Sequence, residues 1–366
     1  MRRIFFITVL LFLACTALVW AEPKVAIVKA TDINLACYDW KVDVLDPTKK
    51  WEAYWTRAGE AEVEKMVRKA VELAGDFPVK RGDTVVIKTN LVENVTHFVY
   101  AIYPYRPPPD PEYANRFIQS MVVDARVVRA IALICKERGA KEVTIVAGPL
   151  SGSAYRSFDV YGYTKMAGDI KVGLYDVGDG PFKDYKGPRG LGLDRYTLPR
   201  KVIEADVQIS VGAMKTHVVA GVTLSLKNWG MGIPPGSVYG AMKLGLPHYV
   251  LYHVITAVNW ISKVDYAFID GLWGMEGVGP VQGEPVEMGL VIAGADPVAV
   301  DTVGIRCMDF DPLHFGHIRL CKEYGIGTYE HIEVVGEKIE DVKKDFAPVP
   351  EQFRYPDEWG GNTGWD

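Results

Sequence analysis

Residues 84–90 read TVVIKTN, and this stretch decides the fold. Its apolar part, residues 84–87, is an uninterrupted β-branched run, which is typical of a strand covered on both faces. A helical pattern that ends at Gly75 precedes the run, and a second helical pattern occupies residues 123–138 after it. Another apolar strand follows at residues 143–146, so that strand, helix and strand alternate.

The same alternation extends toward both ends of the chain. Further strands are predicted at residues 24–29, 207–211, 266–269, 289–292 and 332–335, and further helices at 239–262 and 297–308. Strands joined through helices in this order form right-handed crossovers and a parallel sheet. We therefore predict an α/β fold with a mostly parallel sheet, helices on both faces, and a single large domain over residues 22–347.

Two segments depart from this rhythm. Residues 100–109 form an aromatic and proline-rich insertion, which cannot be a central strand because proline lacks the N–H that a ladder needs. It is either a lid over the neighbouring strand end or an exposed polyproline loop. The tail, residues 348–366, is rich in Pro, Gly, aromatic and acidic residues, which predicts irregular chain.

The first 21 residues have the features of a signal peptide. Arg2 and Arg3 precede an apolar stretch at residues 4–18, and Ala21 is a small residue at the expected cleavage point. The stretch is shorter than the roughly 20 apolar residues that span a bilayer, so no stable membrane span is expected after cleavage. We predict a periplasmic or secreted protein, exported by the general, the twin-arginine or the lipoprotein route.

Charge and cysteine content narrow the class of partner. The formal net charge is -5, and no Lys/Arg cluster stands out, which argues against nucleic acid as a partner. Four cysteines remain after cleavage: Cys37, Cys135, Cys307 and Cys321. Cys307 and Cys321 are the pair that we would test for a disulfide, and buried free thiols are the alternative.

Polar residues follow several of the predicted strands, at the sheet edge where parallel sheets bind ligands. Three lysines from separate places in the chain would make a positive pocket in an acidic protein, which favours a carboxylate, phosphate or sulfate. Residues expected to bind the substrate are Lys88, Asn90, Lys215, Lys227 and Asn228, and those expected to act in catalysis are His217, Asp270 and Glu276. A glycine-rich turn is expected directly after Asn228.

Each of these residues also has a structural interpretation. Asp296, directly before Pro297, has the pattern of a helix N-cap, and Asp301 could be an ion-pair partner one turn later. Lys88 and Asp270 could pair across neighbouring strand ends. His217, Asp270 and Glu276 could instead hold a divalent ion, whereas His248 with His253, and His314 with His317, lack the spacing or a third ligand. The metal requirement and the cofactor stay unknown.

Several short motifs make this chain resemble the domain of unknown function 362 family. They are residues 86–90 (VIKTN), 215–217 (KTH), 221–228 (GVTLSLKN), 270–271 (DG), 275–280 (MEGVGP) and 295–301 (ADPVAVD), in the family's order. The resemblance implies no settled activity. Some relatives look like iron–sulphur proteins through a ferredoxin-like segment, but this sequence has no Cys-x-x-Cys-x-x-Cys run, so no intrinsic ferredoxin-type cluster is expected.

Three hypotheses about function follow. The first is an enzyme that acts on a small anionic substrate, held by the lysines, with His217 transferring a proton and Asp270 or Glu276 as its carboxylate partner. The second is a periplasmic binding protein or redox-linked accessory protein that captures an anion or a redox partner without chemistry. The third is structural, with the lysines and acids neutralising one another at the sheet edge.

Overall fold

The computed structural model describes residues 22–42, 52–92, 111–150 and 152–354. The predicted leader and the insertion at residues 100–109 therefore lie outside the described residues, as does the tail from residue 355. None of the helices within the described ranges is long and apolar enough to cross a membrane.

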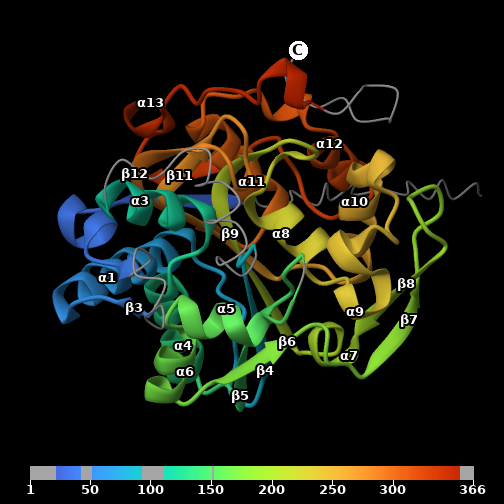
Figure 1. Ribbon diagram of the computed structural model, residues 1–366, viewed down its shortest axis with the longest axis horizontal. Helices are drawn as coiled ribbons and strands as arrows, with labels where there is room; N and C mark the ends of the chain where they lie inside the picture. Colours follow the sequence, from blue (N-terminus) through green and yellow to red (C-terminus); the bar gives the residue numbers. More distant parts are fainter. Residues whose placement is uncertain (1–21, 43–51, 93–110, 151, 355–366) are drawn as a thin grey trace, which may run out of the picture.

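The described chain is built on one large sheet (Figure 1). In spatial order its strands are β13 (Glu333–Gly336), β1 (Lys24–Lys29), β12 (Glu284–Gly294), β11 (Tyr266–Glu276), β9 (Val207–His217), β4 (Thr84–Thr89), β5 (Glu142–Ala147) and β6 (Gly173–Asp176), and β10 (Gly221–Val222) pairs with β9. β12 runs antiparallel to both neighbours, β10 runs antiparallel to β9, and the other pairs are parallel. The prediction of a mostly parallel sheet is confirmed.

Helices cover both faces of the sheet, as predicted. One face packs against α1 (Arg57–Ala74), α3 (Pro111–Met121), α4 (Ala125–Glu137), α5 (Ala154–Val160) and α6 (Tyr163–Ile170). The other face packs against α7 (Arg200–Ile203), α8 (Leu224–Gly232), α10 (Leu251–Ile261), α11 (Pro297–Cys307), α12 (Gly316–Glu323) and α13 (Ile339–Val342). In Figure 1, α1, α4 and α6 lie to the left of the central strands β9 and β4, and α8 and α10 lie to their right.

The remaining elements are short. They are the hairpin strands β2 (Lys41–Val42) and β3 (Ala53–Tyr54), the hairpin strands β7 (Phe182–Lys186) and β8 (Arg195–Pro199), the helix α9 (Gly236–Tyr239), and the turns η1 (Asn34–Tyr38), η2 (Ala241–Lys243), η3 (His248–Val250), η4 (Pro312–His314) and η5 (Glu351–Phe353).

Helix ends follow the capping residues that the sequence contains. α1 ends at Gly75, whose φ of 69° is a conformation that suits glycine. Asp124 caps α4, and Asp296 caps α11 by accepting hydrogen bonds from the N–H groups of Val298 and Ala299. The N-cap interpretation of Asp296 is therefore confirmed.

Two predicted elements were wrong. The helix expected at residues 239–262 begins only at Leu251, because Gly240, Gly245 and Pro247 break the preceding stretch into short turns. The expected glycine-rich turn after Asn228 is instead the end of helix α8.

The glycines of α8 serve close packing instead of a turn. A Cβ on Gly230 would lie 2.7 Å from the Cα of Ile255 in α10, and a Cβ on Gly232 would lie 2.5 Å from the Cε of Lys88. Any larger side chain would push the helix away from these neighbours. The sequence shows glycine density but not this reason for it.

Cys307 and Cys321, the pair to be tested for a disulfide, do not form one, and the alternative of buried free thiols is confirmed. All four cysteines of the described residues, Cys37, Cys135, Cys307 and Cys321, are buried and free. Cys307 ends α11 and Cys321 lies in α12, where its Sγ is 3.7 Å from the Oγ1 of Thr256. Burial raises the pKa of each of these thiols, which keeps them protonated and unreactive.

Candidate functional site

Lys88 lies at the carboxyl end of β4, and its side chain is only 2% exposed. Its Nζ donates hydrogen bonds to the backbone oxygen of Thr89 and, at 3.1 Å, to Oδ1 of Asn228. Neither partner carries a charge. Burial lowers the pKa of Lys88 well below its usual value, and the neighbouring Lys243 and Lys227 lower it further.

The amide of Asn228 joins two strands to helix α8. Its Oδ1 also accepts a hydrogen bond from Nδ2 of Asn90 at 3.1 Å. Its Nδ2 donates to the backbone oxygens of Lys88 and Val211 and to Oγ of Ser210, at 3.0 to 3.1 Å. The structure thus brings Lys88, Asn90 and Asn228 together, as expected, but the two asparagines mainly hold the lysine and the backbone in place.

Lys215 belongs to the next parallel strand, β9, and is completely buried. Its Nζ donates a hydrogen bond to the backbone oxygen of Met121, at the end of α3. Burial lowers the pKa of Lys215 well below its usual value, and the charges of Lys227 and Lys88 add to the effect. It is a second lysine with a carbonyl as its partner, but this contact lies on the face of the sheet that α3 covers, opposite to α8.

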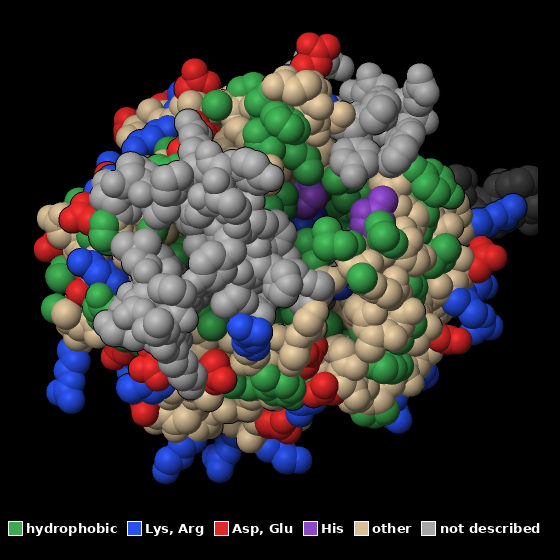
Figure 2. Space-filling view, viewed as in Figure 1, with side chains coloured by type: hydrophobic (Ala, Val, Ile, Leu, Met, Phe, Trp, Pro, Cys, Tyr) green, Lys and Arg blue, Asp and Glu red, His purple; other side chains and the backbone are tan. Residues whose placement is uncertain are grey.

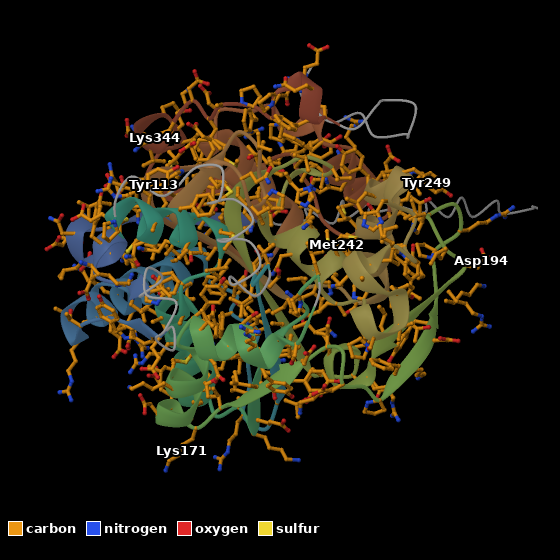
Figure 3. All side chains as sticks on the ribbon, viewed as in Figure 1. Tyr113, Lys171, Asp194, Met242, Tyr249 and Lys344 are labelled. Atoms are coloured by element: carbon orange, nitrogen blue, oxygen red, sulfur yellow. The ribbon has the colours of Figure 1, made fainter. Side chains whose placement is uncertain are left out.

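Lys243 is a third buried lysine, and sequence reasoning missed it. It lies in η2, and its Nζ donates to the backbone oxygens of Met231 at 2.7 Å and Gly148 at 3.1 Å. Burial lowers the pKa of Lys243 to about 7, helped by the charge of Lys227. The only signal in the sequence is a lysine among glycines in residues 240–245, a segment that lies within the helix predicted at residues 239–262. Its neighbour Met242 is 44% exposed and lies near the centre of the molecule in the view of Figure 3.

Lys227, on α8, differs from the other three lysines. It is partly exposed, and no hydrogen-bond or ion-pair partner is found for its ammonium among the described residues. Burial lowers the pKa of Lys227 to about 8. Its charge in turn lowers the pKa of Lys88, Lys215 and Lys243, so it lies within electrostatic reach of all three.

His217 ends β9 beside this lysine cluster, which consists of Lys88, Lys215, Lys227 and Lys243. Its Nδ1 accepts hydrogen bonds from the backbone N–H groups of Val219 at 3.1 Å and Ala220 at 3.2 Å. Burial, together with Lys227 and other neighbouring side chains, lowers the pKa of His217 well below its usual value. Because Nδ1 is an acceptor, the single proton of this neutral imidazole is on Nε2.

Two further histidines lie within electrostatic reach of His217. His317 is completely buried between aromatic rings, its ring centroid 5.5 Å from that of Tyr252, and burial lowers the pKa of His317 to about 3. Nδ1 of His248 donates a hydrogen bond to the backbone oxygen of Leu246 at 2.9 Å. Figure 2 shows histidine side chains on the walls of a hollow in this face, with a basic side chain visible at depth.

Asp270 does not join this group, contrary to expectation. Its carboxylate accepts hydrogen bonds from the backbone N–H groups of Asp124 at 2.7 Å and Leu272 at 3.0 Å, so that it holds the start of α4. Burial and the nearby Asp124 raise the pKa of Asp270 to about 7. The expected ion pair between Lys88 and Asp270 is absent from the described residues, and Asp270 makes no hydrogen bond with His217.

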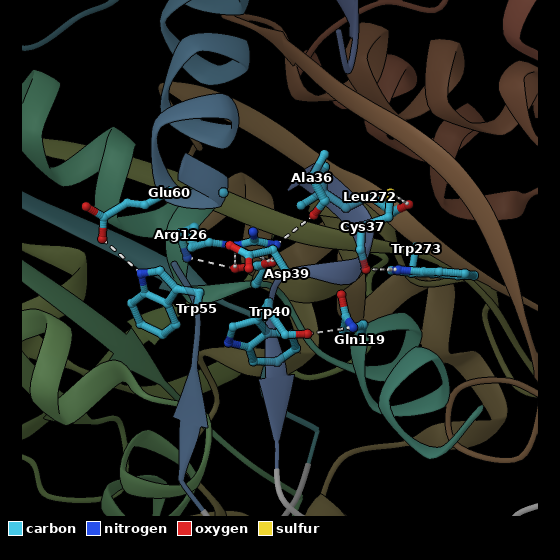
Figure 4. A network of polar contacts seen from close by, with 12 residues as sticks. Ala36, Cys37, Asp39, Trp40, Trp55, Glu60, Gln119, Arg126, Leu272 and Trp273 are labelled. Atoms are coloured by element: carbon cyan, nitrogen blue, oxygen red, sulfur yellow. Dashed lines mark hydrogen bonds and ion pairs between the residues drawn. The ribbon is translucent and has the colours of Figure 1, made fainter. Parts of the chain in front are cut away.

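The surroundings of Asp270 are structural. Asp124 pairs with the buried Arg126, which donates to the backbone oxygens of η1, including that of Ala36 at 2.6 Å (Figure 4). Trp273 donates to the backbone oxygen of Cys37 at 2.7 Å in the same network. Asp270 therefore belongs to a network that attaches η1 and α4 to β11, on the opposite face of the sheet from α8.

Glu276 is also turned away from His217. Its Oε2 accepts a hydrogen bond from the backbone N–H of Ala347 at 2.8 Å. The loop after it does reach the end of β9, since the N–H of Val218 donates to the oxygen of Gly279 at 3.0 Å. No group of three His, Cys, Asp or Glu side chains in the described ranges could hold a metal ion, so the divalent site of His217, Asp270 and Glu276 does not form there.

A cavity of about 380 Å³ adjoins the cluster at the ends of β5 and β6. Its lining includes Gly148, whose backbone oxygen accepts from Lys243, together with Ser153, Asp176 and Ser237. Asp176 is engaged by backbone N–H groups, including that of Ala154 at 2.7 Å. Lys243 reaches the wall of this cavity through the oxygen of Gly148, and the space is large enough for a small molecule.

The family model for the domain of unknown function DUF362 matches residues 111–306, which contain three of the four lysines and His217. This match covers more than half of the chain. The chain belongs to the DUF362 family. The resemblance that the motifs indicated is thus confirmed, and the family's description assigns no activity.

Two individual comparisons add little about function. A thylakoid-associated protein of Synechocystis sp. is 26% identical over 244 residues, which cover 65% of this chain and 66% of that protein. The chain thus spans slightly less than two thirds of this relative's length. A crystal structure of a Thermotoga maritima protein aligns with 72% of this chain and 58% of its own, at 14% identity and a TM-score of 0.37, a likeness too weak to inform on fold or function.

Proposed function

We propose that this DUF362 protein binds a small anionic molecule in the crevice formed by the lysine cluster and His217. One observation carries the proposal: Lys227 lies within electrostatic reach of Lys88, Lys215 and Lys243, and none of the four forms an ion pair with a carboxylate among the described residues. Like charges held together under low dielectric repel one another strongly. A bound carboxylate, phosphate or sulfate would relieve this repulsion.

The structural alternative, in which lysines and acids neutralise one another, has less support. Asp270 and Glu276, the two acids that were expected to do so, accept hydrogen bonds from backbone N–H groups elsewhere. Asp176 is an acid close enough to raise the pKa of Lys243, and it makes no ion pair with that lysine. The positive charge in the crevice is therefore left for a ligand to balance.

His217 fits a binding role better than the proton transfer that we had expected. With Nδ1 occupied by two backbone N–H groups, the ring presents an Nε2–H donor and no free lone pair. A neutral imidazole in this tautomer donates a hydrogen bond to an anion or a carbonyl oxygen. Within the described residues, no carboxylate bonds to this ring to help it to accept a proton.

The experiment is a thermal-shift screen of the purified chain against inorganic phosphate, sulfate, malonate and pyruvate, repeated with Lys227→Met. We expect at least one anion to raise the melting temperature of the wild type, and Lys227→Met to lose that shift. Lys29→Met is the matched control, because Lys29 is exposed at the end of β1. A shift that Lys227→Met retains, or no shift with any anion, contradicts the proposal.

We also propose that the chain is exported, with residues 1–21 as the leader, 22–347 as the domain and 348–366 as the tail. The support is the basic start followed by the apolar stretch at residues 4–18. Expression with a carboxyl-terminal tag, cell fractionation and mass spectrometry of the amino terminus test this. A new terminus at Glu22 in the exported fraction supports it, and an intact Met1 on cytoplasmic protein contradicts it.

A further inference from the structure

We infer that the ligand is a small anion with an aldehyde or ketone group, and that the side-chain amine of Lys227 forms an imine with that carbonyl. The inference deepens the proposed function, because it rests on anion binding in the same crevice. It gives the substrate class as oxo acids and related carbonyl-bearing anions.

Lys227 is the lysine of the cluster whose nitrogen is available for reaction. The Nζ atoms of Lys88, Lys215 and Lys243 each donate to backbone oxygens, which fixes their positions and directs their N–H bonds into the protein. For Lys227 no such partner is found in the described part of the chain, and its side chain is partly exposed. A ligand can reach this amine without breaking an existing hydrogen bond.

The surroundings also favour the neutral amine, which is the nucleophilic form. Burial lowers the pKa of Lys227 to about 8, so that about a tenth of the amine is unprotonated at pH 7, far more than for an ordinary lysine. Desolvation beside other cationic groups is a recognised way to activate a lysine for attack on a carbonyl. The burial of Lys227 provides the desolvation here, and no acidic partner for it is found among the described residues.

The remaining groups suit the other parts of such a ligand. Nε2–H of His217 can donate a hydrogen bond to the carbonyl oxygen and polarise the bond under attack. The buried lysines attract the carboxylate or phosphate of the ligand.

The reaction balances without an oxidant, a reductant or a cofactor. The nitrogen lone pair forms a C–N bond to the carbonyl carbon while the C=O π bond breaks and its oxygen takes up a proton, which gives a carbinolamine. The nitrogen then loses its protons, the hydroxyl leaves as water, and a C=N bond forms. One amine and one carbonyl compound therefore give one imine and one water.

The test is reductive trapping. The purified full chain is incubated with pyruvate, or separately with glyoxylate, in the presence of sodium cyanoborohydride, and the modified lysine is identified by peptide mass spectrometry. We expect one reduced adduct, located at Lys227, to form about tenfold or more faster than labelling of the exposed Lys29. Lys227→Arg, which keeps the charge, removes this adduct, whereas Lys29→Met leaves it unchanged.

Titration calorimetry with lactate, which matches pyruvate but lacks the carbonyl, separates the two proposals. If pyruvate and lactate bind equally and neither pyruvate nor glyoxylate gives a specific adduct, the imine is overturned while anion binding stands. If neither anion binds and no adduct forms, the proposed function fails as well. An adduct located at another lysine, or spread over surface lysines, also overturns the inference.

Discussion

Lys227 determines the electrostatics of the crevice, because its charge acts on every other basic group there. It lowers the pKa of Lys88, Lys215, Lys243 and His217. Removing one charge should therefore be felt at residues that the side chain does not touch. Such an effect separates an electrostatic cluster from lysines that merely lie near one another.

We expect Lys227→Met to raise the pKa of Lys243 above about 7, by roughly one unit, since a repelling charge is removed. Reductive ¹³C-methylation of the lysines followed by an NMR pH titration measures this value. Lys29→Met is the control and should leave the Lys243 titration unchanged. An unchanged pKa in Lys227→Met would show that the two amines do not interact.

Anion affinity should fall as pH rises. Burial lowers the pKa of Lys227 to about 8 and that of Lys243 to about 7, and an anion prefers the protonated forms, which disappear above these values. Sulfate keeps its charge in this range, so its affinity should be about tenfold or more weaker at pH 9 than at pH 6. Titration calorimetry measures it, and a flat or rising affinity argues against lysine control.

The position of residues after predicted strands identified most of the residues around the crevice. It did not show to which face of the sheet each side chain points. Lys88 and Asp270 both follow apolar runs that predict strands, yet β11 continues past Asp270 to Glu276, and side chains alternate between the faces of a strand. Lys88 contacts α8 on one face and Asp270 contacts the start of α4 on the other. Lys243 could not be found because the turns of residues 240–247 bring it to the site, and no strand pattern marks that segment.

At the scale of elements, α8 carries Lys227 and Asn228 and is positioned by a carboxylate from α11. Asp301 is completely buried and accepts hydrogen bonds from the N–H and Oγ of Ser225 and from the N–H of Leu226, at 2.6 to 2.9 Å. A negative group at a helix N-terminus is favourable. The predicted ion-pair role of Asp301 is thus replaced by a helix-capping role.

We expect Asp301→Ala to lower the free energy of unfolding by about 2 to 4 kcal/mol, because two buried N–H groups lose their acceptor. The same variant should weaken anion binding, since α8 would lose its fixed position. Urea unfolding and sulfate titration measure the two effects. Asp169→Ala, at an exposed position on α6, is the control and should change stability by about 0.5 kcal/mol or less.

The main strands and several helices were predictable because apolar runs, helical spacing and capping residues are local signals. The exact roles of glycines were not, as α8 shows. Gly232 leaves room for the side chain of Lys88, which lies 144 positions earlier in the chain. Gly230 leaves room for the backbone of α10. The hairpin of β7 and β8 was missed because β7 is largely exposed and polar, and β8 is a short strand without a continuous apolar run.

For the molecule as a whole, the crevice concentrates positive charge in a chain with a formal net charge of -5. Such a concentration destabilises the unliganded fold, because each buried ammonium must lose its hydration, its proton or both. An anion that binds only the folded state should raise the free energy of unfolding, by about 2.7 kcal/mol at 100 times its dissociation constant.

We expect this stabilisation to be seen in urea unfolding of the wild type with saturating sulfate. The gain should be largest below pH 7 and should decline as the lysines lose their protons above that pH. Chloride at equal ionic strength is the control for simple screening. Equal effects of sulfate and chloride at all pH values would mean that no specific anion site contributes.

Proton uptake on anion binding is the most direct test of whether a bound anion restores charge to the lysine cluster. Calorimetric titration of sulfate into the wild type at pH 8, in two buffers with different ionisation enthalpies, gives the number of protons taken up. We expect binding with net uptake of protons from the buffer, because the anion restores charge to lysines whose pKa the crevice has lowered. Lys227→Met should lose that uptake. Binding without proton uptake, or uptake that Lys227→Met retains in full, would contradict this expectation.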